Sequence, residues 1–338
     1  MQRRLPVALI ISALAVPFLG AGTVTAQEDP PGVGVPITIT DPDGIIRGSV
    51  TIREVADPFT GHDPSATPPD GMRYVALTVT FEAAPDQSLD AQPYHVALMD
   101  ADGVLYTTQY VPRPADAQIS DLQSQLMAPD DRVSGIVSFV MPAEATLDRI
   151  VYQPAYDRLV ELVDLLPGAG PGLGDAVAYT DPTGATVTMS AQLQDPFTEF
   201  EPAYPPGEGT RFVMLQPVFE NSGTLPYWAE PYDLYLRDGM GRLFTTTTIN
   251  RPAGFSVPLL ESQTLSPGDR ISGYVGYVVP ADAQLADVLY IPESSRVISL
   301  ADLGGGGSGS AAPTPSTEAS PPPAPGSPTP DPSAGTDR

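Results

Sequence analysis

Two histidines, His62 and His95, are the only side chains in the chain whose ordinary pKa lies near neutrality. A nucleophile activated by a general base at pH 7 would have to use one of them. The positions 138 residues later hold Phe200 and Asp233, so neither histidine returns where other motifs do. The chain also has no cysteine and no G-x-S-x-G motif. We therefore expect no catalytic residues, and we place His62 in an exposed loop and His95 on a strand surface.

Acidic clusters are the second candidate for chemistry, because carboxylates are the ligands that Ca²⁺ prefers. Asp100-Ala101-Asp102-Gly103 resembles the start of a calcium loop, but position 111 holds Val111 where an EF-hand needs Glu. We therefore expect a hairpin turn there. A further acidic loop consists of Asp57, Asp63 and Asp70, with Asp195, Glu199, Glu201 and Glu208 as later counterparts. This loop could chelate Ca²⁺ or be solvated, so the metal ligands stay undecided.

Three aromatic residues are candidates for binding. Tyr94 and Tyr232 each follow a proline and precede a strand pattern. They could anchor a binding face, but we expect core or corner tyrosines, because buried aromatic rings dominate sandwich cores. Trp228 is the single tryptophan and has no aromatic counterpart in the first repeat. If it is exposed, it is the better candidate for a binding hot spot.

The charge of the chain limits its partners. The formal net charge is -25, and every basic side chain is an arginine or a histidine. Such a chain repels phosphate backbones, so we expect no nucleic-acid partner. The same charge opposes binding to an anionic membrane surface. Nothing in the sequence calls for a cofactor.

The N-terminus has the pattern of a secretory signal peptide. Arg3 and Arg4 precede an apolar run from Leu5 to Leu19, and small residues lead to Ala26. The run is shorter than the ~20 residues of a spanning helix. We expect cleavage after residue 26, no membrane span afterwards, and a secreted or cell-surface protein; an uncleaved anchor is the alternative.

The rest of the chain is an internal repeat. Asp57-Pro58-Phe59-Thr60 returns as Asp195-Pro196-Phe197-Thr198, and Asp131-Arg132-Val133-Ser134-Gly135 returns as Asp269-Arg270-Ile271-Ser272-Gly273, both 138 residues later. A period this long indicates whole-domain duplication. We place the copies at residues 33–166 and 174–303, joined by a Gly/Pro linker at 167–173. Residues 304–338 are rich in Gly, Pro and Ser and are expected to be disordered.

Each copy shows strand patterns. Residues 72–81 alternate apolar and polar side chains, and residues 211–219 repeat this with Pro217 as an exception that suggests an edge or a bulge. Further strands are expected at 94–99, 104–110, 132–140, 149–152 and 159–163, with the second-copy equivalents. Seven or eight short strands per copy are typical of an antiparallel β-sandwich. Residues 117–127 are the one segment where we allow a helical turn.

The second copy resembles a known family. The motif reads Val218-Phe219-Glu220-Asn221-Ser222-Gly223, then Tyr232 to Asp238, then Leu265 to Gly273, and ends at Val279-Pro280-Ala281-Asp282. It is similar to a secreted bacterial domain-of-unknown-function family with the immunoglobulin-like sandwich of the mycobacterial immunoprotective extracellular antigen. In the first copy, Ala83 replaces the Asn and Asp130 replaces the Gly. The resemblance implies an all-β fold of two tandem immunoglobulin-like sandwiches and no catalytic residues.

These observations favour a non-enzymatic protein. We expect a binding, adhesion or spacer module whose partner is a protein or glycan at the cell envelope. The alternative is a secreted Ca²⁺-dependent carbohydrate-binding protein or hydrolase that uses the acidic loops.

Overall fold

The computed structural model describes residues 32–166, 168 and 170–304, which belong to one compact unit. The expected signal peptide and, apart from Gly304, the expected C-terminal tail lie outside the described residues, as do linker positions 167 and 169. The described part is all-β, with antiparallel sheets and two short 3-10 turns as its helical elements. None of its helical elements is long and apolar enough to cross a membrane.

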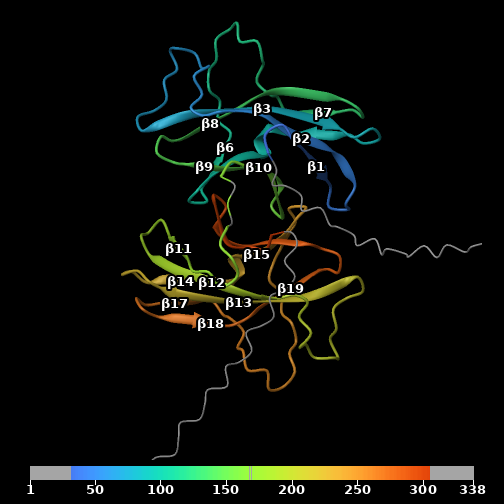
Figure 1. The fold of residues 1–338 in the computed structure, drawn as a ribbon, viewed down its shortest axis with the longest axis vertical. Coiled ribbons are helices and arrows are strands. Elements are labelled where there is room, and N and C mark those ends of the chain that lie inside the picture. Colours follow the sequence, from blue (N-terminus) through green and yellow to red (C-terminus); the bar gives the residue numbers. More distant parts are fainter. Residues whose placement is uncertain (1–31, 167, 169, 305–338) are drawn as a thin grey trace, which may run out of the picture. The chain divides into compact units, whose positions relative to one another are not determined.

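The N-terminal half, residues 32–166, packs two main sheets face to face (Figure 1). One sheet has the order β1-β2-β3-β8 and the other has the order β10-β9-β5-β6, while β4 and β7 form a separate pair. The strands are β1 (Pro36–Thr40), β2 (Ile46–Ala56), β3 (Met72–Ala83), β4 (Leu89–Ala91), β5 (Val96–Asp100), β6 (Leu105–Thr107), β7 (Gln125–Met127), β8 (Arg132–Pro142), β9 (Leu147–Ala155) and β10 (Arg158–Asp164), with the 3-10 turn η1 (Pro93–His95) before β5.

The C-terminal half, residues 170–304, has the same strand order. Its sheets run β11-β12-β13 followed by β18 and β19, and β16-β15-β20-β21, with β14 paired to β17. The strands are β11 (Val177–Thr180), β12 (Thr186–Gln194), β13 (Thr210–Asn221), β14 (Tyr227–Ala229), β15 (Leu234–Asp238), β16 (Leu243–Phe244), β17 (Gln263–Leu265), β18 (Arg270–Ser272), β19 (Val275–Pro280), β20 (Leu285–Glu293) and β21 (Arg296–Asp302), with the 3-10 turn η2 (Pro231–Asp233) before β15.

Each half has its own hydrophobic core between its two main sheets. In the N-terminal half the alternation of β3 turns Val75, Leu77, Val79 and Phe81 inward, all fully buried. Burying side chains of this size contributes about 1.5–3 kcal/mol each relative to leaving them exposed. A second cluster fills the C-terminal half in the same way, with Val213, Leu215 and Phe219 from β13.

Pro217 lies in the middle of a sheet, where its missing N–H has a visible effect. It pairs with Ala191 of β12 on one side. On the other side β18 pairs up to Val218 and β19 resumes at Leu215, so the ladder is broken opposite Pro217. The equivalent β8 of the N-terminal half runs without a break. The expectation of an edge strand or a bulge was therefore wrong: β13 is central, its pairing keeps one register on both sides of Pro217, and the proline interrupts only one of its two ladders.

Three other expectations need correction. Residues 117–127 contain no helical turn; they run irregularly into β7, which pairs with β4. The strand expected over 104–110 is confined to β6. The one expected over 270–278 is divided into β18 and β19.

Candidate functional site

The first candidate for a metal loop, the turn after β5, uses its aspartate to close the hairpin. Asp100 is buried, and its Oδ1 accepts hydrogen bonds from the N–H groups of Asp102 at 3.0 Å and Val104 at 2.8 Å. Its Oδ2 accepts from the Tyr106 hydroxyl at 2.7 Å. Both oxygens are therefore engaged within the turn, as an Asx-type hairpin requires.

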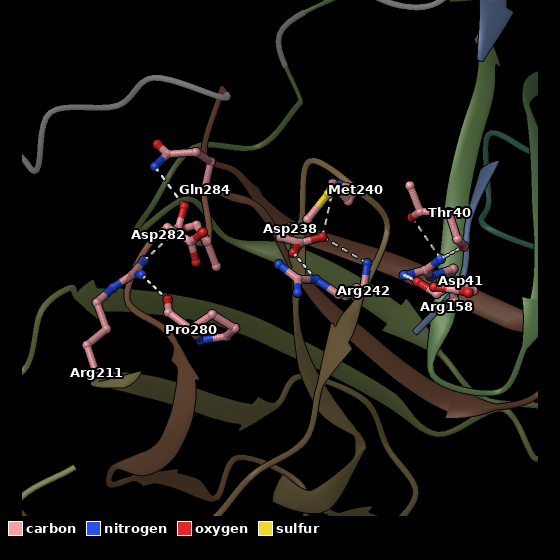
Figure 2. Close-up of polar contacts among 11 residues, drawn as sticks. Thr40, Asp41, Arg158, Arg211, Asp238, Met240, Arg242, Pro280, Asp282 and Gln284 are labelled. Carbon is pink, nitrogen blue, oxygen red and sulfur yellow. Dashed lines mark hydrogen bonds and ion pairs between the residues drawn. The ribbon is translucent and has the colours of Figure 1, made fainter. Parts of the chain in front are cut away.

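Asp238 closes the equivalent turn after β15. Its Oδ1 accepts from the N–H groups of Met240 at 3.0 Å and Arg242 at 2.9 Å, and its Oδ2 pairs with the Arg242 guanidinium at 2.7 Å (Figure 2). The two turns thus share one backbone design with different partners on the outer carboxylate oxygen.

The acidic loops are held by internal contacts. Asp57 forms a two-pronged ion pair with Arg73, and Asp195 forms the equivalent pair with Arg211. Asp63 accepts hydrogen bonds from the N–H and hydroxyl of Ser65. Over the described residues, no group of three or more acidic or histidine side chains is arranged to hold a metal ion. The structure therefore does not bring the acidic side chains of either loop, Asp70, Glu199, Glu201 and Glu208 included, into one chelating cluster.

Both histidines are less exposed than expected. His62 packs edge-on against Tyr74 at 5.1 Å between ring centroids, and its Nδ1 lies 2.9 Å from the Asp63 carbonyl. His95 lies in η1 against buried Tyr152, and its Nδ1 is buried. Burial lowers the pKa of His95, opposed by the Asp90 carboxylate. Both rings therefore pack against aromatic side chains of the N-terminal half.

The two proline-linked tyrosines point outward, so the expectation of core tyrosines was wrong. Tyr94 is 70% exposed and Tyr232 is 68% exposed. Each lies in a 3-10 turn whose proline is buried instead of the tyrosine. The turn breaks the alternation of the following strand, and for this reason the inward-outward pattern of β5 or β15 does not extend to these rings.

Trp228 is also exposed, at 55%, and its position follows from strand alternation. Tyr227 and Ala229 on either side of it are buried, and the Tyr227 hydroxyl meets that of Tyr290 at 2.7 Å in the core. Trp228 therefore lies on the outer side of β14, opposite Thr264 of β17. Burial of Tyr227 sets which side of β14 faces the core, and the alternation of the strand then directs the Trp228 indole outward.

Glu230 links the exposed aromatic residues. Its Oε2 accepts a hydrogen bond from the Trp228 indole N–H at 3.1 Å, and its Oε1 accepts from the Tyr232 backbone N–H at 3.4 Å and the Ser262 hydroxyl at 2.6 Å. We call Trp228, Glu230, Tyr232 and Ser262 the aromatic face. One carboxylate thus orients the indole and caps the turn that carries the tyrosine.

A second carboxyl group lies beside this face. Asp233 is half-buried at the end of η2, and burial together with the nearby Glu230 charge raises its pKa to about 6. The face therefore carries one carboxylate that is held by hydrogen bonds and one carboxyl group that titrates in mildly acidic solution.

The N-terminal half has a different surface at the equivalent place. Asp90 stands where Trp228 stands, Leu126 stands where Thr264 stands, and the Gln92 amide donates to Asp90 at 2.8 Å. Leu126 is 75% exposed and Tyr94 provides the ring. Both halves therefore expose an apolar side chain and a tyrosine at this place, which are Leu126 and Tyr94 in the N-terminal half. An indole held by a carboxylate is found only in the C-terminal half.

A separate hollow of about 440 Å³ is formed by the loop after β16. It is lined by Arg251, Phe255 and Tyr274 among others, and the Arg251 guanidinium lies 4.2 Å from the Tyr274 ring centroid and 5.0 Å from that of Phe255. The guanidinium also donates to the Val257 carbonyl oxygen. These contacts stabilise the loop.

An exposed indole and phenol with adjacent carboxylates can bind a ligand without reacting with it. The rings offer apolar contact area, and the carboxylates accept hydrogen bonds from hydroxyl or N–H groups. The sequence singled out Trp228 and Tyr232 but not Glu230. The one feature of the sequence that pointed to Glu230 is its position, two residues from Trp228 and two from Tyr232. In an extended chain this spacing places Trp228 and Glu230 on the same side.

Comparison with known proteins finds one family model that is similar to part of the chain. Residues 44–158 match the model of the family described as Domain of unknown function (DUF4352). No curated protein matches the chain. Among solved structures, the yjhA protein from Bacillus subtilis is similar at 14% identity and a TM-score of 0.28, over 38% of this chain and 84% of that one. In residues 44–158, therefore, the chain is similar to the DUF4352 family, whose description names no activity.

Proposed function

We propose that this chain is a secreted, non-enzymatic binding module built from two tandem copies of an immunoglobulin-like domain, and that its aromatic face binds a glycan at the cell envelope. The signal-peptide pattern of residues 1–26 and the repeat at 138 residues support secretion and duplication. The equal strand order of the two halves supports the duplication further.

One observation carries the binding function: Trp228 is exposed although it is held in place by Glu230. An indole fixed in this way loses little side-chain entropy when a ligand covers it. Trp and Tyr are also the residues most enriched in binding hot spots.

The negative charge of the chain limits which classes of ligand the aromatic face can bind. Glu230 and Asp233 make the face acidic, and the whole chain carries -25. A neutral or amino-substituted polysaccharide fits better than an anionic one, because its hydroxyl or ammonium groups donate to these carboxylates and its C–H surfaces cover the rings. An extended proline-rich peptide is the competing ligand class, since such peptides bind aromatic grooves.

The test uses Trp228 as its own reporter, because the chain has no other tryptophan. The full chain is titrated with a panel of soluble cell-wall and neutral polysaccharides and with proline-rich peptides, while indole fluorescence and binding heat are followed. We expect a saturable change with a glycan, and binding weakened at least ~30-fold in Trp228→Ala, as for a hot spot worth about 2 kcal/mol. Tyr204→Ala is the matched control and should bind normally, because Tyr204 is exposed in the loop before β13, whereas the aromatic face follows the other end of β13.

Binding that survives Trp228→Ala would contradict the proposal. If such binding also required Ca²⁺ and were abolished by EGTA, it would favour the acidic-loop alternative instead. Binding of the peptides alone would support the aromatic face as the binding site but would show that its ligand is a peptide and not a glycan.

A further inference from the structure

The two halves contact each other through hairpin tips and the outer side of one sheet of each half. Two short antiparallel bridges join them, Val104 with Arg296 and Arg158 with Arg242. Four backbone hydrogen bonds flank these bridges: Leu105 N to Ser295 O and Leu243 N to Asp157 O, both 2.8 Å, and Val297 N to Gly103 O at 2.8 Å and Leu159 N to Gly241 O at 2.7 Å.

Every one of these contacts has a reciprocal partner. Residue 242 lies 138 positions after residue 104, and residue 296 lies 138 positions after residue 158. The first bridge therefore joins position 104 to the equivalent of 158, and the second joins position 158 to the equivalent of 104. The hydrogen bonds obey the same exchange, because Leu105 and Asp157 are the equivalents of Leu243 and Ser295.

The side chains between the halves repeat this pattern. One buried cluster spans both halves, and we call it the junction; its members are Ala97, Met99, Leu105, Val151 and Leu159 from the N-terminal half and Tyr235, Leu243, Leu289, Ile291 and Val297 from the C-terminal half. Four members of the first set have their equivalents in the second. The tips also approach with no room for side chains: a Cβ on Gly103 would lie 2.0 Å from the Val297 carbonyl oxygen, and one on Gly241 would lie 2.6 Å from that of Leu159.

A contact in which position i meets j while j meets i defines a two-fold, isologous interface. Such an interface is made by one surface that is complementary to itself. We propose that the junction surface of each half is self-complementary, and that the partner it fits, when the other half does not cover it, is the same surface on a second copy of this chain.

One ion pair breaks the symmetry and explains the pairing within one chain. Arg237 reaches across the junction to Glu161 at 3.4 Å. The reciprocal positions hold Met99 and Ser299, and the Ser299 hydroxyl is buried without a hydrogen-bond partner. A pair of N-terminal halves would set Met99 against Glu161 twice, whereas the pairing within the chain gains the arginine. The short linker further favours it by raising the effective concentration.

The test blocks one surface at a time in the full chain. Leu243→Asp with Val297→Asp disables the C-terminal surface, and Leu105→Asp with Leu159→Asp disables the N-terminal one. Sedimentation velocity over a concentration series should show a monomeric parent chain. Either double variant should double in mass, because its intact surface is uncovered, and the quadruple variant should be monomeric.

Cysteine pairs test the geometry, on a chain that has no native cysteine. In the variant with the N-terminal surface disabled, Arg242→Cys and Arg296→Cys should form disulfides between two chains, because a two-fold places 242 of one chain beside 296 of the other. Either cysteine alone should give no cross-linked dimer. Antiparallel bridge partners of this kind lie close enough for a disulfide.

The two double variants check each other, with circular dichroism as the folding control. Monomeric, folded double variants would overturn the proposal, as would a dimer that persists in the quadruple variant or cross-links through a single cysteine. Unfolding of both double variants would show that the halves are not separable surfaces, and it would also overturn it.

Discussion

Arg73 holds Asp57 in a two-pronged ion pair, with Nε 2.6 Å from one carboxylate oxygen and NH2 3.0 Å from the other. The remaining guanidinium nitrogen donates to the carbonyl oxygens of Pro142 and Ala143, at the end of β8. This single side chain therefore ties the loop after β2 to the end of β8, across the intervening strand β3. Arg211 and Asp195 repeat the arrangement, with Arg211 reaching the Pro280 carbonyl oxygen at 2.5 Å (Figure 2).

The first prediction concerns this ion pair. Asp57→Ala should lower the free energy of unfolding by about 1–3 kcal/mol, because a partly buried, bidentate guanidinium loses its charged acceptor. Urea unfolding measures the change. The exposed pair of Arg132 and Glu82 is the matched control, and Glu82→Ala should cost no more than about 1 kcal/mol. Equal losses in the two variants would contradict the prediction.

Asp130 has a backbone conformation that glycine tolerates better. Its φ of 65° is the one positive value at a non-glycine position in the described residues, and Gly268 has φ 84° at the equivalent turn. Asp130→Gly should therefore stabilise the chain by about 0.5 kcal/mol. This is the net effect of relieving the strain of the positive φ and of the larger conformational entropy that glycine has in the unfolded state. The reverse change Gly268→Asp should destabilise it in the same urea assay. A loss of stability in Asp130→Gly would show that the aspartate side chain matters more than its backbone.

Asn221 is a fully satisfied buried amide. Its Nδ2 donates to the carbonyl oxygens of Leu225 and Leu265, both at 2.8 Å, and its Oδ1 accepts from the Gly223 N–H at 3.0 Å. Asn221→Ala should cost about 1–3 kcal/mol, because the buried Leu265 carbonyl and the partly buried Leu225 carbonyl each lose a hydrogen-bond donor, while the Gly223 N–H keeps its bond to the Thr186 carbonyl oxygen. The equivalent residue is Ala83, so the C-terminal half alone should show the loss when thermal unfolding is followed by Trp228 fluorescence. An unchanged melting temperature would contradict the prediction.

Asp233 makes stability depend on pH. Its folded-state pKa of about 6 lies above the ordinary aspartate pKa of 3.8, so the folded state holds its proton more tightly than the unfolded state. The favourable contribution is complete below pH 4 and is lost as the pH rises through about 6. Asp233→Asn should therefore raise the melting temperature at pH 7.5 and leave it nearly unchanged at pH 4.

Asp86→Asn, at an exposed loop carboxylate, provides the control for a general effect of charge removal. It should give melting temperatures close to those of the parent chain at both pH values. A stabilisation by Asp233→Asn that is the same at pH 4 and 7.5 would show that relief of net charge, rather than protonation of Asp233, is responsible.

Strand positions were predictable from sequence where one face of a strand is buried. The alternation in residues 72–81 corresponds to β3, and the turn at Asp100 follows from its own side chain. Tyr94 and Tyr232 were misjudged because a 3-10 turn, set by the preceding proline, interrupts the period of two. The β4–β7 pairing joins Leu89 to Met127, with η1, β5, β6 and the irregular residues 108–124 between them in the chain, and no local pattern indicates such a contact.

The candidate site was predictable only in part. The sequence indicated Trp228 and Tyr232 as candidate binding residues because of their residue types. Their role in the site also depends on their exposure and on Glu230, whose carboxylate accepts hydrogen bonds from both residues. The reciprocal contacts of the junction were not visible in the sequence either. The repeat gives equivalent positions, yet which of them meet depends on how two folded surfaces pack.

Pro217 gives the C-terminal half a seam that the N-terminal half lacks. The ladder from β13 to its neighbour is divided into β18 and β19, whereas β3 and β8 share one continuous ladder. The continuous run of paired residues that must separate together is therefore shorter in the C-terminal half. In amide hydrogen exchange, β18 should open and exchange independently of β19, while the amides along β8 keep a common protection factor.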